Sequence, residues 1–254
     1  MLLRRLKAHS AQICLCLCVF FGCSLPGQAA APSQTGNRPF VVVIDPGHNP
    51  QQGGALGARG IYEVRYNDAL SAKLAAALQS IGVQVLLTRT ATEEISLDGR
   101  AVLANTRQAD LFLAVHHDSA QLKYLNKTEV NGAAAYQTKQ SIAGYSIFVS
   151  AINPKFALSL QFAQLLGSEL RALGRPPTLH HAEPIAGENR ALLDANLGIY
   201  QFDELLVLRK TTVPAVLLEV GVIVDRADEA YVSDTANQDA VVKAVVAAVG
   251  AFRH

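Results

Sequence analysis

The chain has 254 residues, half of them hydrophobic and 17% charged, and a formal net charge of +1. This composition is typical of a globular protein of moderate size with a large core. The near balance of basic and acidic side chains gives no electrostatic case for binding nucleic acid.

Residues 1–31 have the pattern of a secretory signal peptide. Three basic residues near the start precede the apolar stretch ICLCLCVFFGCSL, and the small residues of PGQAAAP follow it, so we expect cleavage near Ala31. The apolar stretch is too short for a membrane span, and no later stretch reaches that length. We therefore expect an exported protein of the periplasm or cell envelope, with no transmembrane span in the mature chain.

All four cysteines lie within this segment, at Cys14, Cys16, Cys18 and Cys23. A chain cut near residue 31 keeps none of them, so its fold can use neither disulfides nor thiolate metal ligands. The cut also removes three basic and no acidic residues, which leaves 19 basic against 21 acidic side chains. Lipid attachment at Cys23 is the alternative interpretation, and the bulky Phe20 and Phe21 before it disfavour that interpretation.

Residues 32–38, PSQTGNR, are expected to form a flexible leader, and residues 39–254 a single domain. Apolar runs of this domain are continuous rather than alternating, which is typical of strands covered on both faces of a mostly parallel sheet. The runs are 40–45, 83–88, 111–115, 145–149, 204–208 and 214–220. The sequence therefore predicts a sheet of about six strands.

Between these runs, apolar residues recur at helical spacing. The helical segments are 70–81, which Gly82 follows, 156–173, which Gly174 follows, and 241–252. Strands that alternate with helices predict a layered α/β/α domain. Two polar stretches, 118–144 and 175–203, are long connections, and such connections in compact domains are usually functional or mobile.

Ionisable residues gather at one edge of the predicted sheet. His48 follows the first apolar run, His116 ends the third, and Glu219 lies near the end of the last. Glu63 lies on the loop that returns from His48. Because parallel sheets bind ligands at the carboxyl ends of their strands, we expect these two imidazoles and two carboxylates to lie together.

Six segments resemble, in the same order, the motifs of the zinc-dependent N-acetylmuramoyl-L-alanine amidases, which cut stem peptides from muramic acid in peptidoglycan. The segments are IDPGH, GARGIYEVRYN, LLTR, RAVLAN, ADLFLAVHHDS and LVLRKTTVPAVLLEVG. The resemblance runs from about Phe40 to the C-terminal helix. Each motif alone is weak, and the six together in this order are specific.

The resemblance implies one zinc ion per chain, held by His48, Glu63 and His116, with Glu219 as the catalytic acid/base. Two imidazoles and a carboxylate suit a catalytic zinc, which keeps a fourth position open. The implied reaction is hydrolysis of the amide bond between N-acetylmuramic acid and L-alanine in peptidoglycan. Glu219 takes a proton from the attacking water and then gives it to the departing amine.

Each of these residues also has a plainer explanation. His48 could be a polar loop residue, and Glu63 could be a carboxylate favoured by the dipole at a helix N-terminus. Glu219 could pair with a buried arginine. A glutamate within an apolar strand is costly without a partner or a task, and its place near the strand end favours the task. We therefore favour the metal site.

His116 and His117 cannot both bind one ion, because adjacent residues of a strand point to opposite faces. The family's histidine corresponds to His116, and we interpret His117 as facing the substrate or as supporting the ligands. Arg209 corresponds to a family arginine and is a second candidate for substrate binding, with a structural ion pair as the alternative.

Four polar residues of segment 175–203 have no counterpart in the family motifs: His180, His181, Glu183 and Glu188. We interpret them as part of a solvated loop, with contact to substrate or to a second metal as the alternative. Some family members block their zinc with an inserted helix until an activator protein binds. Segment 175–203 could act in this way or line the groove, and the sequence leaves both open.

Two other functions remain as alternatives. An exported zinc peptidase that acts on cell-wall peptides would use the same scaffold, and substrates with and without the muramyl group distinguish it from an amidase. A non-catalytic wall-binding or regulatory protein of this fold would have lost a ligand or the base, whereas all four positions are present here. The segments DPGHNPQQGG and HHDS depart from the family's commoner pattern, so the stem-peptide preference stays open.

Overall fold

The computed structural model describes residues 38–254, which form one compact unit. The expected signal peptide, residues 32–37 of the expected leader, and Cys23 with its lipidation alternative lie outside the described residues. Within the described part of the chain, no helix combines the length and the apolar character that crossing a membrane requires.

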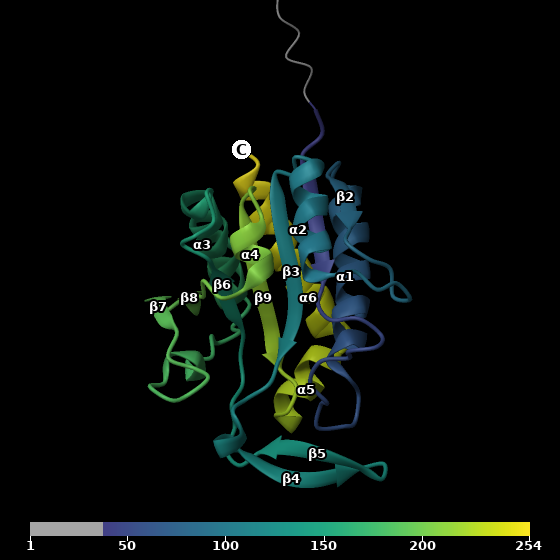
Figure 1. Cartoon of the computed structure of the whole chain (residues 1–254), viewed down its shortest axis with the longest axis vertical. Coiled ribbons are helices and arrows are strands. Elements are labelled where there is room, and N and C mark those ends of the chain that lie inside the picture. The colour runs from purple at the N-terminus through teal and green to yellow at the C-terminus, as the bar shows by residue number, and fades with distance from the viewer. Residues whose placement is uncertain (1–37) are drawn as a thin grey trace, which may run out of the picture. The chain divides into compact units, whose positions relative to one another are not determined.

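A seven-stranded sheet forms the centre of the domain, in the order β2-β1-β3-β9-β6-β8-β7 (Figure 1). Its strands are β1 (Val41–Pro46), β2 (Gln84–Leu87), β3 (Leu111–Asp118), β6 (Ser146–Val149), β7 (Ala191–Asp194), β8 (Ile199–Gln201) and β9 (Ala215–Val222). Pairing is parallel from β2 through β9 and between β6 and β8, whereas β6 is antiparallel to β9 and β7 to β8. The prediction of a mostly parallel sheet is confirmed.

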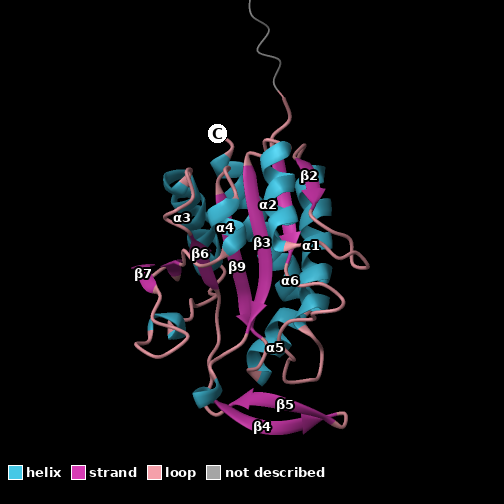
Figure 2. Ribbon diagram, in the orientation of Figure 1, coloured by secondary structure: helices cyan, strands magenta, loops and turns pink. Residues whose placement is uncertain are grey.

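Helices cover both faces of the sheet, as Figure 2 shows. Helices α1 (Glu63–Ser80), α3 (Phe156–Ala172) and α6 (Thr235–Phe252) pack on one face, over Ile44, Leu113 and Leu218. Helices α2 (Leu97–Thr106) and α4 (Leu206–Lys210) pack on the other, over side chains such as Phe112 and Leu217. Alternate residues of each strand thus enter two different cores, which confirms the layered α/β/α prediction.

The run 204–208 was predicted as a strand, and this prediction is wrong. Its residues form most of helix α4, which is only five residues long. A short apolar run shows that a segment is buried but does not reveal its period, because a strand and a single helical turn bury similar numbers of side chains.

The two polar connections contain regular structure that the sequence did not predict. Segment 118–144 includes a 3-10 turn, η1 (Leu122–Tyr124), and a separate hairpin of β4 (Leu125–Val130) and β5 (Ala133–Thr138). In Figure 1 this hairpin lies beyond the end to which the arrows of β3 and β9 point. Segment 175–203 includes another 3-10 turn, η2 (His180–Ala182), and strands β7 and β8. A short helix, α5 (Arg226–Ser233), follows β9.

Candidate metal centre

His116 and Glu219 are neighbours across two adjacent parallel strands. They are register partners in the pairing of β3 with β9, and adjacent strands lie about 4.8 Å apart. Both side chains follow the alternation of Ala114 and Leu217, so they point to the face that α2 and α4 cover. The central strands thus place an imidazole beside a carboxyl group at the carboxyl edge of the sheet.

His48 reaches this edge from the loop after β1. Its backbone is left-handed, with φ of 62°, a conformation that non-glycine residues rarely adopt. Two buried arginines hold it there: Arg89 Nε donates to the His48 carbonyl at 2.7 Å and Arg100 donates at 2.6 Å. Arg100 also pairs with the buried Asp45 at 2.7 Å, so the charge of the arginine is compensated.

Gly47 allows two parts of the candidate site to approach each other closely. A Cβ on Gly47 would lie 2.4 Å from the imidazole of His116. The left-handed residue of this loop is the next one, His48. The missing side chain at Gly47 therefore lets the loop after β1 lie directly against the ring of His116.

Glu63, the first residue of α1, lies between the two histidines. Its Oε2 is 2.8 Å from Nε2 of His48, and its Oε1 is 3.0 Å from Nδ1 of His116. One ligand atom from each of the three residues can be chosen so that all lie within 4.8 Å of one another. Burial opposes ionisation of this carboxyl group, but hydrogen bonds and charges from His116 and His48 outweigh burial and lower its pKa.

Three further donors fix the orientation of the Glu63 carboxylate. The backbone N–H of Ala55 donates to Oε2, and the side chain of Asn67 and the backbone N–H of His117 donate to Oε1. Metal ligands are commonly held in place by such outer hydrogen bonds. The structure therefore brings His48, Glu63 and His116 together with the carboxylate already oriented.

The interpretation of His117 as a substrate-facing residue is wrong. His117 is only 2% exposed, and its ring lies beside Tyr66 on the α1 side of the sheet. Nδ1 of His117 is 2.8 Å from Oδ1 of Asn67, whose amide group in turn donates to Glu63. Burial lowers the pKa of His117 to about 3. The contacts fit the other interpretation, in which His117 supports the ligands.

Glu219 carries a buried carboxylate oxygen that no described residue satisfies. Its Oε2 is inaccessible to solvent and has no hydrogen-bond partner within residues 38–254. Burial, and then the negative charges of Asp118 and Glu63, raise the pKa of this carboxyl group well above its usual value. A carboxyl group with a raised pKa in a cleft is the kind of group that exchanges protons in catalysis.

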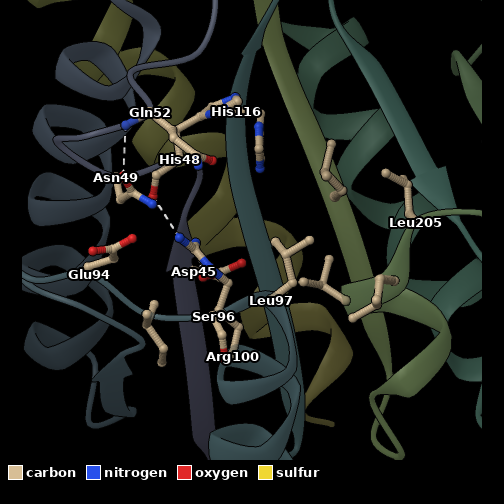
Figure 3. A pocket seen from close by; sticks show the side chains of 14 residues that line it. Asp45, His48, Asn49, Gln52, Glu94, Ser96, Leu97, Arg100, His116 and Leu205 are labelled. Atoms are coloured by element: carbon tan, nitrogen blue, oxygen red, sulfur yellow. Dashed lines mark hydrogen bonds and ion pairs between the residues drawn. The ribbon is translucent and has the colours of Figure 1, made fainter.

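A cavity of about 430 Å³ opens beside the two histidines (Figure 3). Its wall includes His48 and His116, with Leu205 across from them and Arg100 farther along. The side chain of His48 is 33% exposed, so the cluster is accessible from solvent. Arg209 lies exposed on α4 and is not among the residues that line this cavity.

The interpretation of His180 and His181 as solvated loop residues is also wrong. They are 6% and 8% exposed, and both imidazoles lie against Asp118 at the end of β3. Glu188 is likewise drawn inward and contacts His181 at 2.8 Å. Burial opposes protonation of His181, but Asp118 and Glu188 outweigh it and raise the pKa to about 9. Only Glu183 keeps the expected exposed position, paired with Lys123.

Segment 175–203 lines the groove beside the candidate base. A second cavity, of about 230 Å³, has Glu188 and Arg190 of this segment in its wall together with Glu219. Within the described residues, the helical structure of this segment is limited to the three-residue turn η2. Strands β7 and β8 of the same segment extend the central sheet.

Two imidazoles and a carboxylate thus meet at the carboxyl edge of an α/β/α sheet, beside the half-buried Glu219, and this arrangement suits a metal-dependent hydrolase. The chain belongs to the N-acetylmuramoyl-L-alanine amidase family, whose sequence profile matches residues 42–251. The family that the motifs predicted is thereby confirmed.

Individual relatives agree with the family. A probable cell wall amidase, LytH of Staphylococcus epidermidis, is 27% identical over 208 residues, which are 81% of this chain and 56% of LytH. The chain thus spans little more than half the length of that relative. The catalytic domain of the amidase CwlV from Bacillus (Paenibacillus) polymyxa var. colistinus has a TM-score of 0.63 and 25% identity, covering 84% of this chain and 97% of that domain.

A third neighbour, with 17% identity, shares the fold. It is the CwlD amidase of Clostridioides difficile, solved in complex with the GerS lipoprotein, with a TM-score of 0.63 and coverage of 84% of this chain and 98% of CwlD.

Proposed function

We propose that this protein hydrolyses the amide bond between N-acetylmuramic acid and L-alanine in peptidoglycan. Family membership supports this reaction. The observation that carries it is the convergence of His48, Glu63 and His116 beside Glu219, whose buried Oε2 has no partner within the described residues. A buried carboxyl oxygen without a partner costs free energy, so it is expected at a site where a substrate or water completes the bonding.

The three clustered side chains fit zinc. Two imidazole nitrogens and one carboxylate oxygen are the donors that catalytic zinc sites use, and residues 38–254 contain no cysteine. Glu63 is held by Ala55, Asn67 and the His117 backbone, so the carboxylate is oriented before an ion arrives. When bound there, zinc would polarise the scissile carbonyl and lower the pKa of the attacking water.

Glu219 would move the proton in both halves of the reaction. Its Oε2 accepts a proton from the water as the water oxygen attacks the carbonyl carbon. The same proton then passes to the alanine nitrogen as the carbon–nitrogen bond breaks, because an amide nitrogen leaves readily only when it is protonated. Burial of the Glu219 carboxyl group raises its pKa, which suits a group that must hold a proton between the two steps.

The test compares the purified protein with a Glu219→Gln variant, which keeps the shape of the side chain but cannot take up the proton. Incubation with purified peptidoglycan should expose new N-terminal alanine in the parent, and we expect the variant to be slower by 10²-fold to 10⁴-fold. Both proteins should bind the same amount of zinc. Glu129→Gln, on the exposed strand β4, is the matched control and should retain full activity.

Equal activity of Glu219→Gln and the parent would exclude Glu219 as the acid/base. Loss of zinc-dependent activity is expected in His48→Gln, and an active, metal-free His48→Gln protein would contradict the ligand assignment. A peptidase is the second candidate. It would cleave free stem peptides as fast as muramyl peptides, whereas an amidase needs the muramyl group.

We further propose that the protein is exported and acts in the cell envelope, where peptidoglycan lies. The signal-peptide pattern of residues 1–31 and the cell-wall amidases among the relatives support this location. An activator protein is an additional proposal, suggested by the CwlD–GerS complex. Full turnover of peptidoglycan by the purified chain alone would show that no activator is needed.

A further inference from the structure

A second cluster of metal-binding side chains lies beside Glu219. His180 and His181, on the turn η2, meet Asp118 at the end of β3, and one ligand atom from each can be chosen so that all three lie within 4.8 Å of one another. These residues come from segments about 60 positions apart in the chain. The cluster is separate from His48, Glu63 and His116, and the proposed amidase reaction does not use it.

Both imidazoles direct the same ring nitrogen at Asp118. Nε2 of His180 is 3.4 Å and Nε2 of His181 is 2.8 Å from Oδ2 of Asp118. The two rings are tilted by 37° to each other, with centroids 3.9 Å apart. Three potential donor atoms thus converge on one point from two segments of the chain.

The opposite ring nitrogens are held by outer partners. Nδ1 of His180 is 2.7 Å from the hydroxyl of Thr178, and Nδ1 of His181 is 2.8 Å from Oε2 of Glu188. A histidine that binds a metal typically uses its other nitrogen for a contact of this kind, which fixes the tautomer and the orientation of the ring. Thr178 and Glu188 therefore hold both Nε2 atoms ready for an ion.

One of the converging atoms lacks a partner. The side chain of His180 is only 4% exposed, and its Nε2 makes no hydrogen bond within residues 38–254. At 3.4 Å, its contact with Asp118 is too long and poorly directed to satisfy it. A buried nitrogen aimed at a carboxylate and a second imidazole is well placed to coordinate a cation.

Charge favours a cation at the same point. The carboxylates of Asp118 and Glu188 both lie 2.8 Å from the ring of His181, so a positive charge is favoured among them, and a metal ion would supply it in place of a proton on the ring. A divalent ion would balance both charges, and imidazole with carboxylate suits zinc and similar first-row metals better than magnesium or calcium.

We propose that Asp118, His180 and His181 form a second binding site for a divalent transition-metal ion such as Zn²⁺. An ion there would tie η2 to the end of β3 and thereby fix the wall of the cavity of about 230 Å³ that contains Glu219. This proposal does not depend on the amidase reaction, since it concerns binding alone.

The experiment measures zinc per chain after dialysis of the purified protein against a chelator and then against buffered Zn²⁺. We expect two equivalents in the parent and one each in His181→Gln, His180→Gln and His48→Gln. Loss of both is expected in the double variant that combines His48→Gln with His181→Gln. His254→Gln, at the exposed C-terminal end, is the control and should keep two.

A further variant tests the role of Glu188, which contacts Nδ1 of His181. Glu188→Gln keeps the three ligands, so it should still bind two equivalents at high zinc, with the second bound 10-fold to 100-fold more weakly. Two equivalents in His181→Gln would place the second ion elsewhere and overturn the proposal.

A measurement on the parent protein tests the second site even if the variants fail to fold. Anomalous X-ray scattering from crystals of the zinc-loaded protein should show two peaks, one of them within coordination distance of Asp118, His180 and His181. A single equivalent in the parent, lost in His48→Gln, or a single anomalous peak at His48, would overturn the second site while leaving the first intact. A single equivalent that is lost in His181→Gln but kept in His48→Gln would overturn the proposed catalytic metal site and keep the second site.

Discussion

The left-handed backbone of His48 shows how much structure one candidate ligand requires. A conformation of this kind costs about 1 to 3 kcal/mol and persists only where the surroundings determine it. Arg89 and Arg100 supply that constraint through the His48 carbonyl. The two arginines therefore determine where the imidazole lies, although neither is itself a candidate ligand.

Gly47 is predicted to be the least replaceable residue of this loop. In Gly47→Ala the new methyl group would lie 2.4 Å from the ring of His116, so the imidazole must move. We expect hydrolysis of peptidoglycan to fall by about 100-fold, because displacement of a catalytic group by about 1 Å can have that effect. Gly250→Ala is the control, since its Cβ would meet nothing within 4 Å.

Unchanged activity in Gly47→Ala would show that the loop and the ring can separate without loss. A measured zinc affinity for both variants distinguishes a displaced ligand from a damaged fold.

His117 gives a prediction about pH. It has a pKa of about 3 in the folded protein against 6.5 in the unfolded chain, so between these values only the unfolded state takes up the proton. The contribution to stability is therefore complete above about pH 6.5 and is lost as the pH falls towards 3. Within this window the free energy of unfolding should fall by about 1.4 kcal/mol per pH unit on account of this one group.

The comparison is with His117→Asn, whose amide can still donate to Asn67 but cannot be protonated near neutral pH. Denaturant unfolding in the presence of a chelator, from pH 7 to pH 4, should show a shallower dependence on pH in the variant. Parallel curves for the two proteins would mean that His117 titrates normally.

At the scale of elements, α4 depends on a residue outside it. The side-chain amide of Asn153 donates to the carbonyls of Leu208, Thr211 and Val213, around the end of α4 and the start of β9. Asn153 is 2% exposed, so water cannot replace these contacts. Its position explains how a five-residue helix stays in place on the sheet.

Replacement of Asn153 by alanine should lower the free energy of unfolding by about 3 kcal/mol, because buried carbonyls lose their donor. Thermal or denaturant unfolding measures this change, with Asn126→Ala on the exposed strand β4 as the control. A change no larger than that of the control would show that α4 is held by its apolar contacts alone.

The sequence predicted those elements whose apolar residues form a clear pattern along the chain. The runs that became β1, β3 and β9 are continuous and apolar, so burial on both faces was evident. Strand β7 has two exposed residues among its four, and β8 has only three residues, so neither has a recognisable pattern. The five-residue helix α4 was too short to show its period.

The candidate site was predictable where a side chain ends a strand and not where it depends on tertiary contacts. His116 and Glu219 end predicted strands, and the motifs marked His48 and Glu63. His180 and His181 are buried because β8 pairs with β6 and brings their segment inward, and no local pattern encodes that pairing. For the same reason, the motifs contained Arg89 and Arg100 but did not reveal which carbonyls they contact.

For the whole molecule, metal removal is predicted to lower thermal stability. An ion that binds only the folded state adds about 4 kcal/mol when its free concentration is 1,000 times its dissociation constant. For a domain of this size that corresponds to a fall in Tm of roughly 8 to 16 °C on chelation. His48→Gln should show a smaller fall, and identical Tm values for the parent with and without chelator would contradict metal binding.

Because the chain is made from its N-terminus, the position of β9 in the sheet affects what an incomplete chain can do. β9 follows the other six strands of the sheet in the described chain, yet it lies in the middle of the sheet between β3 and β6. It also carries Glu219, the proposed acid/base. A nascent or prematurely terminated chain that lacks this strand has its core open and its proposed proton carrier missing at the same time. A chain without β9 therefore cannot carry out the proposed hydrolysis.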